Sequence, residues 1–577
     1  MPLSTKYKLD SPYTAFYVVI AVALLSIFIL YDNQFNKKVE GNTGIFLPFR
    51  SVGDRGNIYF IDKEDEKHLA ATTHFGYNLN ISPLEIEDAE EVYEHLSEEI
   101  DIDRKSFFKS AEKSEKDEYE IIERDIPESI QEKIQARIDQ YGLKGVWLEP
   151  FKKREYINGS LAAHTLGFVS VDEEQATRGQ YGVENIFDDV LSSANRVPKT
   201  AATTVLRQLG ELPPENDRPS AGNVTLTIDI NVQRQLEEQL RRIQYNWGAQ
   251  KVGGIVMDPN DGAIVAIGAV PSFNPNTFGQ VTDYSVFNNP IVEDVYEMGS
   301  VFKALTAAIG IDSGRVSLRD SYTDYGQVIV DGEIISNYDS RGRGPNTSIQ
   351  TILSHSLNTG AVFMLQKIGI GTYKDYIDEF RFDSITQVDL PKEIAGLVEN
   401  LNSNREIEFA TASFGQGIAV TPIAAARAFA TLANGGFLVQ PYVTKDIEQP
   451  QVGGVISGRN FTRERKRIFN TSATDKVTAL LTGVYDRGIL GGSLRNTQYS
   501  IAAKTGTAQL VDPQTGKYAE NKFLHSFFGY LPASKPKHLI FLFAVDPKTK
   551  FASTSLSHPF AALANYIISY YAIPPDR

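Results

Sequence analysis

The chain has 577 residues, which is too long for one ordinary domain and suggests about two or three. Its formal net charge of −15, with no basic run interleaved with aromatic residues, argues against a nucleic-acid-binding protein, whose surface carries a basic patch. The lack of cysteine excludes disulfides and thiolate metal sites, and the lack of zinc-hydrolase and phosphate-loop motifs disfavours zinc-dependent and nucleotide-dependent enzymes.

The first predicted element is an uncharged segment, Ser11–Tyr31. As a helix it would span roughly 30 Å, the thickness of the hydrocarbon core of a bilayer. No small-residue cleavage site follows it, which disfavours a signal peptide. We therefore predict a single-pass membrane anchor at residues 13–31, preceded by a short cytoplasmic tail at residues 1–12. Basic residues flank both ends, so charge alone does not fix the orientation of the anchor.

The region after the anchor is strongly charged. Between Leu84 and Gln140, apolar residues recur at roughly helical spacing among many acidic residues and lysines, which predicts amphipathic helices. A polar, turn-rich stretch at Pro213–Asn223 predicts an interdomain linker. We therefore expect an elongated, mixed α/β, non-catalytic domain at residues 32–220 and a second domain at residues 221–577.

The second domain begins and ends with strands. A strand followed by a helix is predicted at 224–240, and two apolar runs around a Pro-Asn-Asp-Gly turn predict a hairpin at 252–270. Helices are expected at 296–314 and 421–434. Three consecutive strands and a closing helix are predicted from these segments: 499–511, 523–532, 538–547 and 558–573. This order predicts an α+β fold, in which an antiparallel sheet takes strands from both ends of the domain and is flanked by helices.

Ser300 and Lys303 stand three residues apart at the start of the predicted helix at 296–314. The pattern S-x-x-K occurs four times in the chain, but only Ser300 begins an apolar helix. Positions three apart share a helix face, so Lys303 can approach the Ser300 hydroxyl. Burial lowers the pKa of a lysine, and a second cation, Lys504, would lower it further, so that Lys303 could serve as a neutral base for a serine nucleophile.

Two polar residues further along the chain complete a possible acyl-transfer site. The pattern S-x-N occurs beyond Ser300 only at Ser356-Leu357-Asn358. We expect the Ser356 hydroxyl to relay a proton to a leaving group and the Asn358 amide to hold the substrate backbone.

The pattern K-T-G occurs once, on the predicted strand at 499–511. Lys504, Thr505 and Thr507 are expected to bind a substrate carboxylate, and Gly506 to keep the face of the strand open to a ligand. The backbone N–H groups of Ser300 and Thr507 are candidates for an oxyanion hole.

These three patterns, in this order, resemble the signature of the penicillin-binding protein and serine β-lactamase superfamily. Further segments look like the transpeptidase domain of class B penicillin-binding proteins: 271–278, 414–436, 504–509 and 525–532. Others look like the non-catalytic, dimerisation-type pedestal of that class: 54–62, 154–169 and 179–191.

The resemblance implies a membrane-anchored peptidoglycan D,D-transpeptidase whose catalytic domain lies outside the cytoplasm, at the cell membrane. Ser300 would attack the D-Ala-D-Ala bond of a donor stem peptide, release D-alanine, and pass the acyl group to an acceptor amine on another strand. β-Lactams would acylate the same serine. The resemblance implies lipid-linked precursor strands as substrates, a polytopic membrane glycosyltransferase as partner, and no metal or cofactor.

Three positions depart from the family pattern. Met298 and Ile157 stand where the family often has proline, and Leu357 fills the variable position of S-x-N. None of these changes removes a reacting group, so they bear on local geometry.

Other functions stay open on the sequence alone. One is hydrolysis by a D,D-carboxypeptidase or a β-lactamase. A β-lactamase needs a base that activates water for deacylation, and Glu399 is the nearest superficial candidate. Another is a β-lactam sensor or inactive cell-wall scaffold. Within the transpeptidases, the segments at 272–276 and 525–532 lean toward the division-type group but do not decide between division and elongation.

Overall fold

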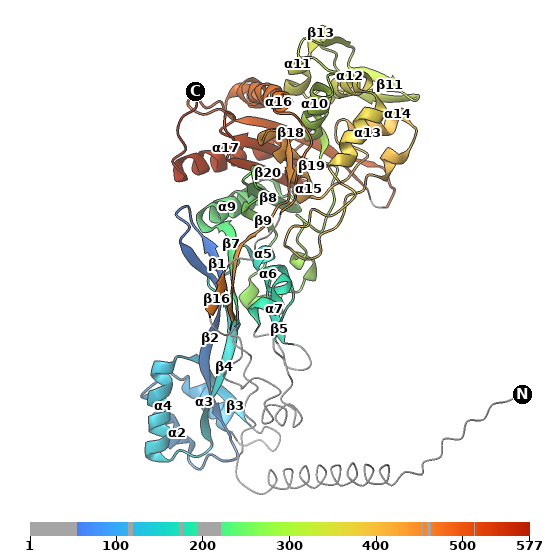
Figure 1. Cartoon of the computed structure of the whole chain (residues 1–577). Helices are drawn as coiled ribbons and strands as arrows, with labels where there is room; N and C mark the ends of the chain where they lie inside the picture. The colour runs from blue at the N-terminus through green and yellow to red at the C-terminus, as the bar shows by residue number, and fades with distance from the viewer. Residues whose placement is uncertain are drawn as a thin grey trace, which may run out of the picture. The chain divides into compact units, whose positions relative to one another are not determined.

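The computed structural model describes residues 55–112, 119–171, 177–192, 221–451, 454–457, 463–512 and 514–577 (Figure 1). The predicted tail and anchor at residues 1–31 and most of the predicted linker lie outside these ranges. Among the helices that are described, none has the length and apolar character needed to cross a membrane.

A seven-stranded sheet combines strands from both predicted domains. Its order is β16-β15-β7-β1-β2-β3, and β4 pairs with β2. The strands are β1 (Ile58–Ile61), β2 (Lys67–Ile81), β3 (Glu120–Ile126), β4 (Val146–Tyr156), β7 (Asn223–Asp229), β15 (Thr444–Gln451) and β16 (Gly454–Ser457). Strand β7 connects the two groups, since it pairs in parallel with β1 and antiparallel with β15.

Three helices pack on residues of β2, β3 and β4 and form a separate hydrophobic core at one end of this sheet (Figure 1). The helices are α2 (Ala89–Ser97), α3 (Arg104–Ala111) and α4 (Glu128–Tyr141). Asp88 and Asp103 cap the first two by accepting backbone N–H bonds. The amphipathic helices predicted between Leu84 and Gln140 are confirmed, although strand β3 interrupts them.

Short elements follow β4 in the same part of the chain. They are α5 (Ala163–Leu166), β5 (Val169–Val171), β6 (Thr177–Gly179), α6 (Gly182–Ile186) and α7 (Asp188–Leu191).

The second sheet has five antiparallel strands in the order β18-β19-β20-β8-β9. The strands are β8 (Lys251–Met257), β9 (Ile264–Val270), β18 (Ala502–Val511), β19 (Tyr518–Leu531) and β20 (His538–Val545). The prediction of an antiparallel sheet built from both ends of the domain is therefore confirmed.

Helices cover both faces of this sheet. Phe527 and Phe528 are neighbours on β19, so their rings point to opposite faces. Phe527 stacks on Phe560 of α17 (Ala552–Tyr570), whereas Phe528 stacks on Phe429 of α15 (Pro422–Ala433). Helix α9 (Ile230–Trp247) packs beside α17, and α16 (Thr471–Gly483) packs against β18.

The predicted helix at 296–314 differs in its first turn. Residues Gly299–Phe302 form a 3₁₀ turn, η4, and the α-helix α10 begins only at Lys303 (Lys303–Asp312). The positive φ of Gly299, +65°, is not helical, so no helix extends back from this turn to Tyr296 as predicted.

Smaller elements surround α10. The helices are α11 (Ile349–Ser354), α12 (Asn358–Ile368), α13 (Ile370–Glu379) and α14 (Glu406–Ala412). The two-stranded pairs are β10 (Ser321–Asp324) with β13 (Gly344–Ser348), β11 (Gln327–Val330) with β12 (Glu333–Ser336), and β14 (Phe437–Val439) with β17 (Arg465–Arg467).

Candidate active site

Ser300 lies in the η4 turn, immediately before α10. The Gly299 N–H donates to the Gly415 carbonyl at 2.9 Å, which holds the turn in place. A side chain at Gly299 would come within 3.0 Å of the carbonyl carbon and oxygen of Thr507. The turn that carries Ser300 therefore lies directly against the backbone of β18.

Lys303 is buried, and its Nζ atom lies 2.8 Å from the Ser300 Oγ atom. The same nitrogen donates to the Ser356 carbonyl at 2.6 Å and to Asn358 Oδ1 at 2.7 Å. Burial, and then the charge of Lys504, hold the pKa of Lys303 well below its usual value. The amine therefore lies within hydrogen-bond reach of the hydroxyl that it would activate.

Lys504 is the second buried lysine of the site. Its Nζ atom donates to Ser356 Oγ at 3.0 Å and to the Thr505 carbonyl at 2.7 Å. Burial lowers the pKa of Lys504 to about 7. Ser356 Oγ also lies 3.4 Å from Lys303 Nζ, so the hydroxyl bridges the two amines.

The turn that carries Ser356 has an unusual backbone. Ser356 has φ +55°, a left-handed conformation that is uncommon for a residue other than glycine. Leu357 is fully buried and anchors the turn in the core, while the Asn358 side-chain amide donates to the Ser336 carbonyl at 2.9 Å. This conformation directs both the carbonyl and the hydroxyl of Ser356 toward the amines.

Strand β18 is the edge strand of its sheet, so one side of its backbone has no partner strand among the described residues. Thr505 and Thr507 are half-buried and alternate with the buried Gly506, as residues on opposite faces of a strand do. A Cβ atom at Gly506 would lie 2.7 Å from the Met298 carbonyl and 3.0 Å from the Val301 nitrogen. The lack of a side chain at Gly506 thus lets β18 lie against the Ser300 turn, and its predicted role toward a ligand stays a prediction.

All the residues predicted from the sequence gather at this point, where η4, the Ser356 turn and β18 meet. The proposed oxyanion-hole residues, Ser300 and Thr507, lie on two segments that the Gly299 contact holds together. The Thr507 hydroxyl accepts a hydrogen bond from the Ala552 N–H at 3.1 Å, which ties β18 to the start of α17.

A buried polar network behind Asn358 was not predicted from the sequence. Asp324 accepts hydrogen bonds from Asn337 and from the Thr359 hydroxyl, which lies at 2.8 Å. It also accepts from the backbone of Gly326 at 3.0 Å. The network ties the segment before the β11–β12 hairpin to the start of α12.

The departures from the family pattern fit their surroundings. Met298 has φ −72°, a value that proline also adopts, and its carbonyl accepts a hydrogen bond from Ser526 Oγ at 2.7 Å. The Ile157 N–H donates to the Ala70 carbonyl at 3.1 Å, a bond that proline could not make. A hydrogen bond therefore holds the backbone at each of these two positions.

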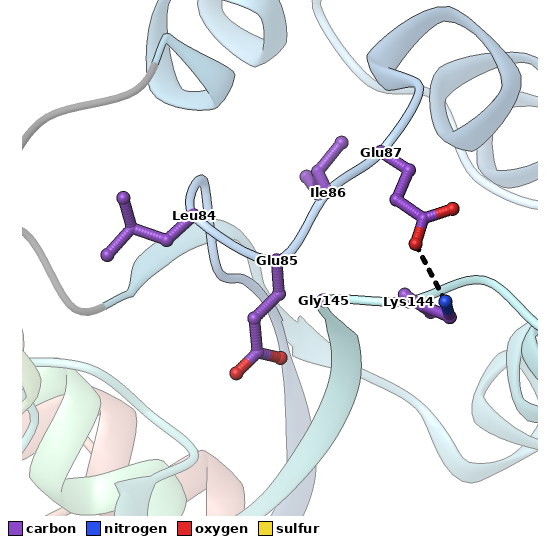
Figure 2. Close-up of a pocket in the computed structure, with 6 residues that line it drawn as sticks. All are labelled: Leu84, Glu85, Ile86, Glu87, Lys144 and Gly145. Atoms are coloured by element: carbon purple, nitrogen blue, oxygen red, sulfur yellow. Dashed lines mark hydrogen bonds and ion pairs between the residues drawn. The ribbon is translucent and has the colours of Figure 1, made fainter.

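Other titratable groups of the described residues lie around this point or away from it. Within the described ranges no group of three or more His, Asp or Glu side chains could hold a metal ion. His525 is buried beside Thr507, its Nδ1 atom lies 2.7 Å from Ser555 Oγ, and burial lowers its pKa to about 4. A pocket beside α2 has an ion pair between Lys144 and Glu87 in its wall and none of the predicted site residues (Figure 2).

Two regions of the chain match known protein families. Residues 252–565 match the family described as penicillin binding protein transpeptidase domain, and residues 50–224 match the family described as penicillin-binding protein dimerisation domain. The chain belongs to the class B penicillin-binding proteins. This penicillin-binding protein therefore carries a serine transpeptidase domain, and its second matched region is of the dimerisation type.

Individual relatives agree with this assignment. The penicillin-binding protein is 28% identical over 507 residues to stage V sporulation protein D of Bacillus subtilis, covering 87% of this chain and 75% of that protein. It is 28% identical over 444 residues to peptidoglycan D,D-transpeptidase FtsI of Escherichia coli, covering 76% of this chain and 71% of that protein. Its fold is similar to that of penicillin-binding protein 2X from Streptococcus thermophilus, with a TM-score of 0.74, 20% identity, and 91% of this chain and 81% of that chain covered.

Proposed function

We propose that this protein is a peptidoglycan D,D-transpeptidase that cross-links stem peptides through an acyl-enzyme on Ser300. The observation that carries the proposal is the 2.8 Å contact between Lys303 Nζ and Ser300 Oγ in a buried site. The relatives named peptidoglycan D,D-transpeptidase support the choice of substrate.

The first half-reaction releases D-alanine. The terminal carboxylate of the donor binds to Lys504 and to the hydroxyl groups of Thr505 and Thr507. Lys303 takes the Ser300 proton as Oγ attacks the carbonyl carbon of the D-Ala-D-Ala bond. The backbone N–H groups of Ser300 and Thr507 stabilise the oxyanion. The C–N bond then breaks, and a proton passes from Lys303 through the Ser356 hydroxyl to the departing amine.

The second half-reaction forms the cross-link. An acceptor amine attacks the acyl carbon, loses a proton to Lys303, and the ester bond to Ser300 Oγ breaks as the serine regains its proton. Asn358 holds the backbone of the donor throughout. β-Lactams acylate Ser300 by the first step alone, because the opened ring stays attached and blocks the acceptor.

We also propose the cellular setting. Residues 1–12 form a cytoplasmic tail, residues 13–31 a membrane anchor, residues 32–220 the pedestal and residues 221–577 the transpeptidase domain, which lies outside the cytoplasm at the cell membrane. The uncharged run at 11–31 supports the anchor. The likeness to FtsI supports the division-type group, with lipid-linked precursor strands as substrates and a polytopic membrane glycosyltransferase as partner.

A labelling experiment tests the reaction. The full-length protein in detergent is treated with a fluorescent penicillin, and separately with a synthetic D-Ala-D-Ala peptide and an amine acceptor. We expect a long-lived adduct, release of D-alanine and formation of the amide product, all of which Ser300→Ala abolishes. Rapid turnover of the penicillin adduct would indicate a β-lactamase. D-alanine release without amide product would indicate a carboxypeptidase, and no adduct would indicate a scaffold.

A further inference from the structure

A cavity of about 530 Å³ lies beside the Ser300 turn, and none of the steps above uses it. Glu297, three residues before Ser300, lines one side, and Gly417 lies next to it. Glu399, the candidate base of the sequence analysis, also lines the cavity, but it is exposed whereas Glu297 is half-buried. The last residues of β18, Gln509–Val511, line the other side. Because one wall is the same strand that carries Lys504 and Thr507, the cavity continues the transpeptidase site along β18.

The direction of a bound donor follows from two fixed points. In the proposed reaction its terminal carboxylate lies at Lys504 and its reacting carbonyl lies at Ser300, whose neighbour Gly299 lies against the Thr507 backbone. The residues that precede this carbonyl must then extend toward Gln509, at about 3.3 Å per residue if they follow the free edge of β18 as an added strand. The residue directly before the D-Ala-D-Ala pair therefore reaches the cavity.

The charges of the site are separated along the same line. The two buried amines, Lys303 and Lys504, stand at the carboxylate end, and Glu297 stands at the cavity end. Glu297 Oε1 accepts from the Gly417 N–H at 2.9 Å and from the Tyr518 hydroxyl at 3.1 Å, so its orientation is fixed.

Glu297 has no cationic partner within the part of the chain that the structure describes. Burial raises its pKa, and only uncharged groups, those of Gly417, Tyr518 and Gln416, oppose this shift by hydrogen bonding. A half-buried carboxylate without a counter-ion is costly, and a cation brought by a ligand would offset that cost.

The donor itself supplies such a cation. Donor and acceptor strands carry the same kind of stem peptide, and the acceptor reacts through an amine. We take this amine to lie on the side chain of the residue that precedes D-Ala-D-Ala in each stem peptide, so that a donor not yet cross-linked also carries it.

We propose, on the basis of the transpeptidase function above, that this cavity binds the ammonium-bearing side chain of the donor residue preceding D-Ala-D-Ala. Glu297 is the specificity-determining residue, because its carboxylate pairs with that ammonium group. The cavity thereby selects donors that keep a free, charged side-chain amine.

Two synthetic peptides test this assignment on the full-length protein in detergent. Both end in D-Ala-D-Ala. One has lysine before that pair and the other has acetyl-lysine, which is uncharged. The measurement is kcat/KM for D-alanine release, normalised to the sites that a fluorescent penicillin labels. We expect a preference of about tenfold for the lysine peptide in the wild type, falling to within about twofold in Glu297→Gln.

A matched control removes the same charge elsewhere. Glu333, on the β11–β12 hairpin, does not line the cavity, so Glu333→Gln should keep the tenfold preference. An equal rate for the two peptides in the wild type would overturn the proposal, as would a preference that survives Glu297→Gln. The proposal would also be overturned if the lysine peptide were preferred as the acceptor but not as the donor.

Two further outcomes are also informative. If Glu297→Gln is not labelled by penicillin, the salt dependence of the wild-type preference for the lysine peptide still tests the proposal. This preference should shrink as KCl rises from about 50 to about 500 mM, and a salt-independent preference would overturn the proposal. If penicillin labels Ser300 but neither peptide releases D-alanine, the proposed function fails, and the subsite fails with it.

Discussion

The amine of Lys303 has three close polar neighbours, and two of them can only accept hydrogen bonds. These two are the Ser356 carbonyl and the Asn358 side-chain oxygen. A neutral amine has two N–H groups and one lone pair. The two acceptors therefore take both N–H groups, and the lone pair is left for the Ser300 hydroxyl. These contacts fit a neutral amine and an ammonium group equally well. Burial, and then the charge of Lys504, lower the pKa of Lys303 and so favour the neutral state that a base requires.

The two lysines predict how acylation depends on pH. Lys504, whose pKa burial lowers to about 7, loses its proton as the pH rises through that value, and with it the charge that binds the carboxylate. Lys303 gains a proton as the pH falls and then no longer accepts one from Ser300. We therefore expect the second-order rate constant for penicillin acylation to pass through a maximum and to decline above about pH 7.

The arginine variant isolates the alkaline side of this profile. Lys504→Arg keeps its charge at all these pH values, so the decline in its rate constant should move upward by at least about one pH unit, whatever its maximum rate. A wild-type rate that stays constant from about pH 6 to about pH 9 would show that neither lysine titrates as described.

At the scale of secondary-structure elements, the site depends on how closely β18 approaches the Ser300 turn. Gly506→Ala would place a Cβ atom 2.7 Å from the Met298 carbonyl and force the two segments apart. We expect this variant to acylate about a hundredfold more slowly and to lose about 1–3 kcal/mol of unfolding free energy. Stopped-flow labelling and urea unfolding would measure the two effects.

A glycine in open space supplies the control for this variant. A side chain at Gly279 would meet no atom within 4 Å, and its φ is not in the left-handed region. Gly279→Ala should therefore leave both quantities nearly unchanged. Full activity of Gly506→Ala would mean that the close approach of β18 is not needed.

The same elements show what the sequence can predict. The strand predicted at 499–511 is β18, and the helices predicted within 224–240 and at 421–434 are α9 and α15. These elements follow from local periodicity, and the K-T-G motif lies on its predicted strand. The 3₁₀ turn at Ser300 does not follow, because the φ of Gly299 depends on packing against Gly415 and β18.

Contacts between segments that are distant in the sequence could not be predicted from it either. Asp324 and Glu297 carry no motif, and their roles appear only when distant segments meet at the site. The pairing of β15 with β7 joins residues more than about 200 positions apart, which local patterns do not encode.

At the scale of the whole molecule, a buried ionic network holds the elements around the seven-stranded sheet together. Glu184 of α6 accepts from Arg55 Nε at 2.6 Å and from Arg154 Nε at 2.7 Å. Glu184→Ala would leave two buried guanidinium groups without this partner. We expect a loss of about 3–5 kcal/mol of unfolding free energy, measured by chemical denaturation.

The network lies outside the transpeptidase site, so folded Glu184→Ala molecules should acylate at the wild-type rate. The exposed Glu64 provides the control, since Glu64→Ala should change stability by less than about 0.5 kcal/mol. A stability change in Glu184→Ala no larger than in this control would show that the network contributes little.

The central claim is that Lys303 activates Ser300, and the acylation rate of Lys303→Ala tests it most directly. The rate constant for covalent labelling by penicillin is measured on full-length wild type and variant, with matching circular dichroism spectra to establish an intact fold. We predict a decrease of about 10²–10⁴-fold in the variant. A variant that folds correctly and acylates at the wild-type rate would contradict the account.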